Sequence, residues 1–224
     1  PVVILGGRRT PMGGLGGDLS DLSAAELGAV AIKGAIRAAG VLEPDISEVY
    51  MGCVLQAGQG QAPARQAALG SGLPNSVESL TINKMCGSGL KAIMLGDQAF
   101  QSDGANFIIA GGMESMTNAP KFEKRNGEDK EMVSTMIHDG LWDVYNDVHM
   151  GNTGEIVANE CNISREKMDA FAARSQNKAA EAEANGWFTW ERFDMPELST
   201  DEGVRTGTTA EKLAGLKPVF QEDG

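Results

Sequence analysis

The sequence has few of the residues that build metal sites and disulfide frameworks. It contains only two histidines and three cysteines in 224 residues, and none of them stand at the spacing of a zinc site. An odd number of cysteines in a chain of this length argues against a disulfide framework and favours a reducing compartment. We therefore expect no structural metal and a cytoplasmic protein.

Long apolar runs and positive charge are also scarce. No run approaches the roughly 18 apolar residues that a transmembrane helix needs, and the opening PVVIL is too short for a signal peptide. The 19 basic and 31 acidic residues leave a net charge of −12. Because such a chain repels phosphates and anionic headgroups, we expect neither a nucleic-acid nor a membrane partner.

The composition itself is that of a globular protein, with 42% apolar and 22% charged residues. Short β-branched or apolar runs alternate with segments of helical periodicity. The expected strands are residues 2–5, 48–55, 77–82 and 106–111, and the expected helices are 23–40, a short one from 63, and 87–100. Strands separated by helices predict an α/β fold with a parallel or mixed sheet that is covered on both faces.

The sequence changes in character after Gly112. Residues 113–152 are polar, and the charged run at 122–131 is expected to be a solvated loop. Helical patterns return at 152–160 and at 164–185. We therefore expect residues 113–210 to form a mostly helical insertion.

Cys86 is the strongest candidate for chemistry. It lies in NKMCGSGLKA, at a predicted strand-to-helix junction, where the helix N-terminus favours a thiolate. The glycines that follow it allow a substrate to approach the backbone, as a nucleophile site requires. On spacing alone, a small buried residue is an equally good interpretation. Cys53, in an apolar strand, and Cys161, at a helix end, are expected to have packing roles.

The glycine clusters between residues 6 and 17, and again at 58–60, do not indicate a nucleotide cofactor. A dinucleotide site needs G-x-G-x-x-G directly after a strand and at the start of a helix. That motif does not occur here. The sequence therefore excludes an NAD-binding fingerprint.

Several segments together resemble the thiolase family, and within it the biosynthetic acetyl-CoA acetyltransferases. They are ILGGRRTPMGGLGG (4–17), NKMCGSGLKA (83–92), AGGMESMTNAP (110–120), HMGNTGEIVA (149–158), ISREKMDAFAARSQNKAAEA (163–182) and RTGTTAEKL (205–213). The resemblance runs along essentially the whole chain.

The resemblance implies a thiolase fold, in which two similar βαβαβαββ halves are stacked in layers. Residues 1–112 would be the half that carries the nucleophile, 113–210 an inserted loop domain that binds CoA, and 211–224 the start of the return to the core. It further implies that the protein is a homodimer or a homotetramer.

The implied activity is acetyl-CoA C-acetyltransferase, the condensation of two acetyl-CoA molecules to acetoacetyl-CoA and CoA. Cys86 would carry the acetyl group. Leu141, His149 and Met150 would line the pantetheine and acyl pocket, and Arg205 would reach the nucleotide end of CoA. CoA thioesters would be substrates, and no further cofactor is implied.

The family's later motifs do not occur in these 224 residues. They are an HPxGxSG-like histidine motif, a later asparagine and a CxGGG-like cysteine motif, which supply proton transfer. We therefore expect the chain to be the N-terminal part of a complete enzyme. The alternatives are a truncated relative that binds CoA or acyl groups without turnover, and a 3-ketoacyl-CoA thiolase for longer chains. A decarboxylating ketoacyl synthase is disfavoured.

Overall fold

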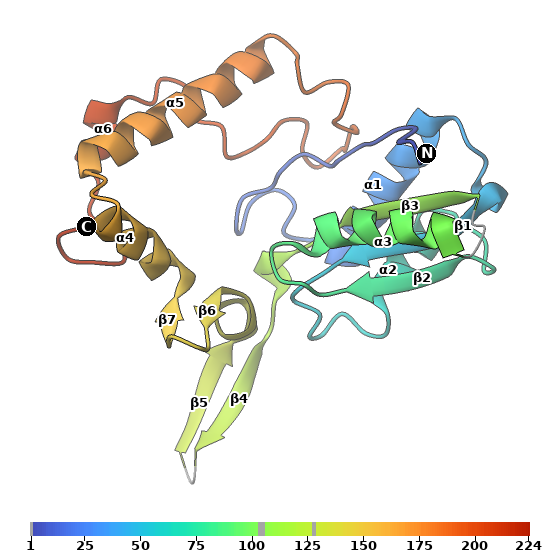
Figure 1. The fold of residues 1–224 in the computed structure, drawn as a ribbon, viewed down its shortest axis with the longest axis horizontal. Coiled ribbons are helices and arrows are strands. Elements are labelled where there is room, and N and C mark those ends of the chain that lie inside the picture. Colours follow the sequence, from blue (N-terminus) through green and yellow to red (C-terminus); the bar gives the residue numbers. More distant parts are fainter. Residues whose placement is uncertain (1, 103–105, 127–128) are drawn as a thin grey trace. The chain divides into compact units, whose positions relative to one another are not determined.

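The computed structural model describes residues 2–102, 106–126 and 129–224 (Figure 1). The chain forms two compact units, one made of residues 1–140 with 190–200 and the other of 141–189 with 201–224. These boundaries differ from the expected domains 1–112, 113–210 and 211–224. The expected domains concern the whole enzyme and stay a prediction.

A parallel three-stranded sheet is the centre of the first unit. Its strands are β1 (Ile46–Gly52), β2 (Glu78–Ile82) and β3 (Phe107–Gly112), in the order β2-β1-β3. Both pairs of neighbouring strands run parallel. Three of the four expected strands are therefore confirmed, and so is the α/β class.

Helices cover both faces of this sheet (Figure 1). They are α1 (Ala24–Ala39), α2 (Pro63–Gly70) and α3 (Ser88–Ser102). A Cβ atom on Gly96 of α3 would lie 3.4 Å from Ile108 of β3. The next residue, Ile109, packs against the core cluster that contains Ile32 of α1. Because successive strand residues point to opposite faces, α3 and α1 lie on opposite sides of the sheet.

Local signals in the sequence account for the position of α1. The Ser23 hydroxyl accepts a hydrogen bond from the backbone N–H of Glu26, and the Glu26 carboxylate accepts one from the N–H of Ser23 at 2.8 Å. The bond from the Ser23 N–H, and a second that the Ser23 hydroxyl donates to the same carboxylate at 2.7 Å, lower the pKa of Glu26. Gly40 ends the helix at φ 66°, in the left-handed region that glycine adopts without strain.

The expectation of a buried strand at residues 2–5 is wrong. This segment forms no strand, and its apolar side chains are exposed, with Ile4 at 83%. Both edges of β1 are already paired, with β2 and with β3. The neighbouring backbone instead bonds to a distant loop, where Arg9 N–H donates to Glu191 O and Phe193 N–H to Arg9 O, each at 2.8 Å.

The charged run at 122–131 is not a solvated loop, as the sequence predicted, but part of a hairpin. Its strands are β4 (Lys121–Asn126) and β5 (Asp129–Ser134), and they pair antiparallel. Lys124 lies opposite Glu131, and the Glu123 carboxylate lies 3.3 Å from the Lys130 ammonium. Opposite charges on facing strands thus support a strand pair that has no apolar alternation.

The second unit is mostly helical. The π-helix Met136–Leu141 leads into this unit. The elements of the unit itself are β6 (Trp142–Asp143), β7 (Val148–His149), α4 (Met150–Glu160), α5 (Arg165–Ala184) and α6 (Ala210–Ala214). The expected helices at 152–160 and 164–185 are confirmed. Among the described residues, no helix combines the length and the hydropathy needed to cross a membrane.

Candidate active site

Cys86 lies at the carboxyl edge of the parallel sheet. The chain leaves β2 at Ile82, forms a tight turn and enters α3 at Ser88, so Cys86 stands two residues before the helix. Its side chain is exposed. Substrates of open α/β sheets bind at this edge, and the amides of a helix N-terminus favour negative charge there. The position therefore matches the expected position of a nucleophile.

The start of α3 sits very close to the ends of β1 and β3. A Cβ atom on Gly52 of β1 would come within 2.6 Å of the Ser88 Cβ atom, and one on Gly112 would lie 3.4 Å from the Gly89 Cα atom. Only glycine permits such an approach at Gly52. The turn that carries Cys86 is thus seated directly on the sheet.

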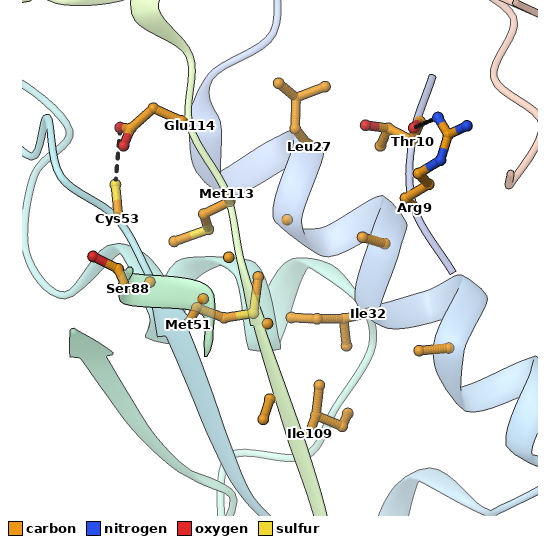
Figure 2. A pocket seen from close by; sticks show the side chains of 18 of the residues that line it. Arg9, Thr10, Leu27, Ile32, Met51, Cys53, Ser88, Ile109, Met113 and Glu114 are labelled. Atoms are coloured by element: carbon orange, nitrogen blue, oxygen red, sulfur yellow. Dashed lines mark hydrogen bonds between the residues drawn. The ribbon is translucent and has the colours of Figure 1, made fainter. Parts of the chain in front are cut away.

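A pocket of about 450 Å³ opens beside Cys86 within the first unit. Figure 2 shows that Ile32, Met51, Ile109 and Met113 form its apolar wall. Cys86 itself belongs to the lining. Such an apolar cavity next to a reactive group is typical of a small-molecule site.

A second thiol in the same pocket is chemically different. Cys53 is 1% exposed, and its sulfur lies 3.5 Å from the Glu114 carboxylate (Figure 2). Burial, and then the negative charge of Glu114, raises the pKa of Cys53 to about 12. Glu114 also accepts hydrogen bonds from the N–H groups of Val54 (2.8 Å) and Leu55 (3.1 Å). Cys53 is thus a protonated core residue, as expected, whereas the expectation that Cys161 packs inside is wrong because it is exposed.

The other predicted site residues all belong to the second unit. Leu141 ends the π-helix, His149 lies in β7, and Met150 begins α4. Arg205 lies in the segment before α6. The structure therefore places these four in one unit and Cys86 in the other.

His149 is held by two contacts inside the second unit. Its Nδ1 atom accepts a hydrogen bond from the Gly151 N–H at 2.9 Å, which caps α4. The neutral ring therefore carries its proton on Nε2. The ring also stacks on Phe220, with centroids 5.2 Å apart and an angle of 20° between the planes.

The backbone at Arg205 is fixed, whereas its guanidinium is exposed. The Arg205 N–H donates to the Gln176 side chain of α5 at 2.8 Å, and Gln176 in turn donates to the Gly203 carbonyl. Within the described part of the chain, the Arg205 guanidinium has no hydrogen-bond or ion-pair partner. A fixed backbone with an available cation suits an anionic ligand.

Sequence reasoning missed three residues that build the Cys86 site: Gly52, Ser88 and Glu114. Their roles depend on contacts between segments that are far apart in the sequence. One signal was available for Ser88, because serine at the first turn of a helix often bonds to nearby backbone.

The fold and the site together define a class of protein, an α/β protein that presents an exposed cysteine beside an apolar pocket. The family model "Thiolase, N-terminal domain" matches residues 2–224. The chain therefore belongs to the thiolase family. No group of three or more potential metal ligands occurs among the residues that the structure covers.

Curated relatives cover the whole chain. It is 49% identical over 237 residues to the acetyl-CoA acetyltransferase of Cupriavidus necator, and 45% identical over 238 residues to that of Pseudomonas aeruginosa. It is also 43% identical over 238 residues to a probable acetyl-CoA acyltransferase of Staphylococcus aureus. In each comparison 100% of this chain aligns with 60% of the relative, so the chain spans about 60% of their length.

Proposed function

We propose that the complete protein is an acetyl-CoA C-acetyltransferase that joins two acetyl-CoA molecules in a reversible Claisen condensation. The observation that carries this proposal is the exposed Cys86, which stands between β2 and α3 beside an apolar pocket. The names of the relatives from Cupriavidus necator and Pseudomonas aeruginosa support acetyl-CoA as the substrate.

In the first half-reaction, the Cys86 thiolate attacks the thioester carbonyl of acetyl-CoA. A bond forms between the Cys86 sulfur and the acetyl carbon, the bond from that carbon to the CoA sulfur breaks, and CoA takes up a proton. The backbone N–H of Cys86 would donate to the oxygen that becomes negative in the tetrahedral intermediate. Such a donor contributes about 2.7–4 kcal/mol in other enzymes.

In the second half-reaction, another acetyl-CoA loses a proton from its methyl carbon to a base. The resulting carbanion attacks the acetyl group on Cys86, so a carbon–carbon bond forms while the bond to the Cys86 sulfur breaks. We assign the base to the later histidine and cysteine motifs that the family resemblance implies. The first half-reaction exchanges one thioester for another, and because thiolates are good leaving groups, this exchange is nearly balanced.

The second unit would hold the CoA portion of the substrate. Leu141, His149 and Met150 would contact pantetheine and the acyl group, and the exposed Arg205 would meet the phosphates or the adenine face. The net charge of −12 makes such a local cation valuable for a polyanionic ligand. We further propose that no cofactor beyond the CoA substrates is needed, and that the protein is a cytoplasmic homodimer or homotetramer.

The test is a thiolysis assay on the full-length protein with acetoacetyl-CoA and CoA, alongside a longer 3-ketoacyl-CoA. We expect cleavage of acetoacetyl-CoA, its loss in Cys86→Ser, and normal rates in Cys161→Ser as a matched control. Preference for the longer substrate would favour a 3-ketoacyl-CoA thiolase. Tight CoA binding without cleavage of either substrate would favour a binding protein without turnover.

A further inference from the structure

The turn that carries Cys86 is closed by a buried hydroxyl. Ser88, the first residue of α3, is only 5% exposed. Its Oγ atom accepts a hydrogen bond from the Lys84 N–H at 2.8 Å and donates one to the Met85 carbonyl at 2.6 Å. The Ser88 hydroxyl is thus bonded to both Lys84 and Met85, the two residues that precede Cys86.

The hydroxyl bridges a residue in an unfavourable backbone conformation. Met85 has φ +49°, in the left-handed region that side chains with a Cβ atom avoid. Its N–H donates to the Asn83 side-chain oxygen at 3.0 Å, and its carbonyl accepts from Ser88. Both polar groups of the Met85 backbone are therefore paired, the N–H with the Asn83 side chain and the carbonyl with both the hydroxyl and the backbone N–H (3.0 Å) of Ser88.

Ser88 itself has little freedom to move. A Cβ atom on Gly52 would lie 2.6 Å from the Ser88 Cβ atom and 2.7 Å from its carbonyl carbon, so Ser88 rests directly on the backbone of β1. The position of the hydroxyl is therefore set by contact with a strand of the sheet, an element that holds side chains more precisely than a loop does.

We propose that Ser88 is a positioning residue for the nucleophile: its hydroxyl stabilises the left-handed Met85 and thereby fixes Cys86 at the N-terminus of α3. This inference rests on the proposed function, because it takes Cys86 as the group that is acylated. Without the bridge, the turn would leave this conformation. We expect the rate of Cys86 acetylation to fall about 5- to 30-fold, which corresponds to the ~1–2 kcal/mol preference against left-handed φ.

The experiment compares Ser88→Ala with Ser71→Ala in the full-length protein. Ser71 is a matched control, because it is also buried and its hydroxyl donates to a helix carbonyl, that of Ala68, at 2.7 Å. The readouts are the rate of Cys86 acetylation by acetyl-CoA and the rate of Cys86 alkylation by iodoacetamide. We expect Ser88→Ala to slow both, acetylation by about 5- to 30-fold, and Ser71→Ala to leave both unchanged.

Two further measurements separate positioning from loss of folding. Cys53 is buried, so its protection from iodoacetamide reports an intact core in each variant. Adding Met85→Gly to Ser88→Ala should restore much of the lost rate, because glycine adopts positive φ without strain. No slowing in Ser88→Ala, or no recovery with Met85→Gly while Cys53 stays protected, would overturn the inference. Failure of the parent protein to acetylate Cys86 would instead count against the proposed function.

Discussion

Arg165 offers the most quantitative test of how the second unit is held together. Its Nε atom lies 3.0 Å from both carboxylate oxygens of Asp169, one turn further along α5. Its two terminal nitrogens donate to the carbonyls of Leu213 and Leu216 at 3.0 Å and of Gly224 at 3.2 Å. One side chain therefore fastens the segment 213–224 to α5.

This fastening bears on the proposed CoA site. The same segment carries Phe220, whose ring stacks on His149. The Asn152 side chain of α4 also donates to the Phe220 carbonyl, at 3.2 Å. Releasing the segment would therefore free one face of His149.

The structure also sets the size of the effect of Arg165→Ala. A hydrogen bond from a charged donor contributes about 1.5–3 kcal/mol, and three such bonds join the Arg165 guanidinium to segment 213–224. The Asp169 side chain is 11% exposed, but that of Arg165 is 30% exposed, so solvent screens part of the interaction. We expect a loss of about 2–4 kcal/mol in the local stability of segment 213–224, or about a 30- to 1,000-fold loss of amide protection.

Hydrogen exchange of the full-length protein, followed by mass spectrometry, measures this directly. Arg174→Ala is the matched control on the same helix, because Arg174 lies over the Phe171 ring, 5.1 Å from its centroid, on the exposed surface. It should leave the protection of 213–224 unchanged. If Arg165→Ala alters that protection by less than about threefold, the hydrogen bonds of Arg165 do not stabilise this segment and the reasoning is refuted.

Three other predictions concern the thiols and the CoA site. Near neutral pH, iodoacetamide should modify Cys86 faster than Cys161, which is exposed but lies at the C-terminal end of α4. It should modify Cys86 much faster than buried Cys53. Equal rates, measured by peptide mass spectrometry, would remove the case for Cys86 as the nucleophile. The pKa of Cys53 is raised from 9.0 to about 12 in the folded state. The free energy of unfolding that the protonated thiol contributes is therefore complete below pH 9.0 and is lost as the pH rises from 9.0 to about 12. Urea titrations should detect this fall in the parent protein and should not find it in Cys53→Ala. Arg205→Ala should weaken CoA binding about 5- to 30-fold in calorimetric titrations at low salt, and less at high salt, because exposed charge pairs are screened; equal affinities at low salt would mean that Arg205 does not contact CoA.

The sequence predicted elements whose signals are local. Helix α1 has its capping box at Ser23 and its terminal glycine at Gly40, and both operate in the structure as expected. The segment 2–5 has the composition of a buried strand, but it pairs with no strand of the sheet β2-β1-β3 and its side chains are exposed. The backbone that follows it instead bonds, at Arg9, to Glu191 and Phe193, a contact that no local pattern in the sequence predicts. The hairpin at 121–134 was missed because cross-strand charge pairs stabilise it.

The distinction between local signals and contacts between distant segments also applies to the site. Cys86 could be identified because the strand-to-helix junction and the adjacent glycines are visible in one short segment. Glu114 could not, because its carboxylate acts on Val54 and Leu55, about 60 positions earlier in the chain. The hydroxyl bridge of Ser88 likewise depends on the unusual φ of Met85, which no propensity predicts.

The most direct test of the central claim is to identify the acylated residue. The full-length protein would be mixed with acetyl-CoA, quenched in acid and digested, and the acetylated peptide located by mass spectrometry. The proposed function predicts one acetyl group on Cys86, released CoA in equal amount, and neither in Cys86→Ser. An acetyl group on Cys161 or on another residue, or CoA release without acetylation of Cys86, would contradict it.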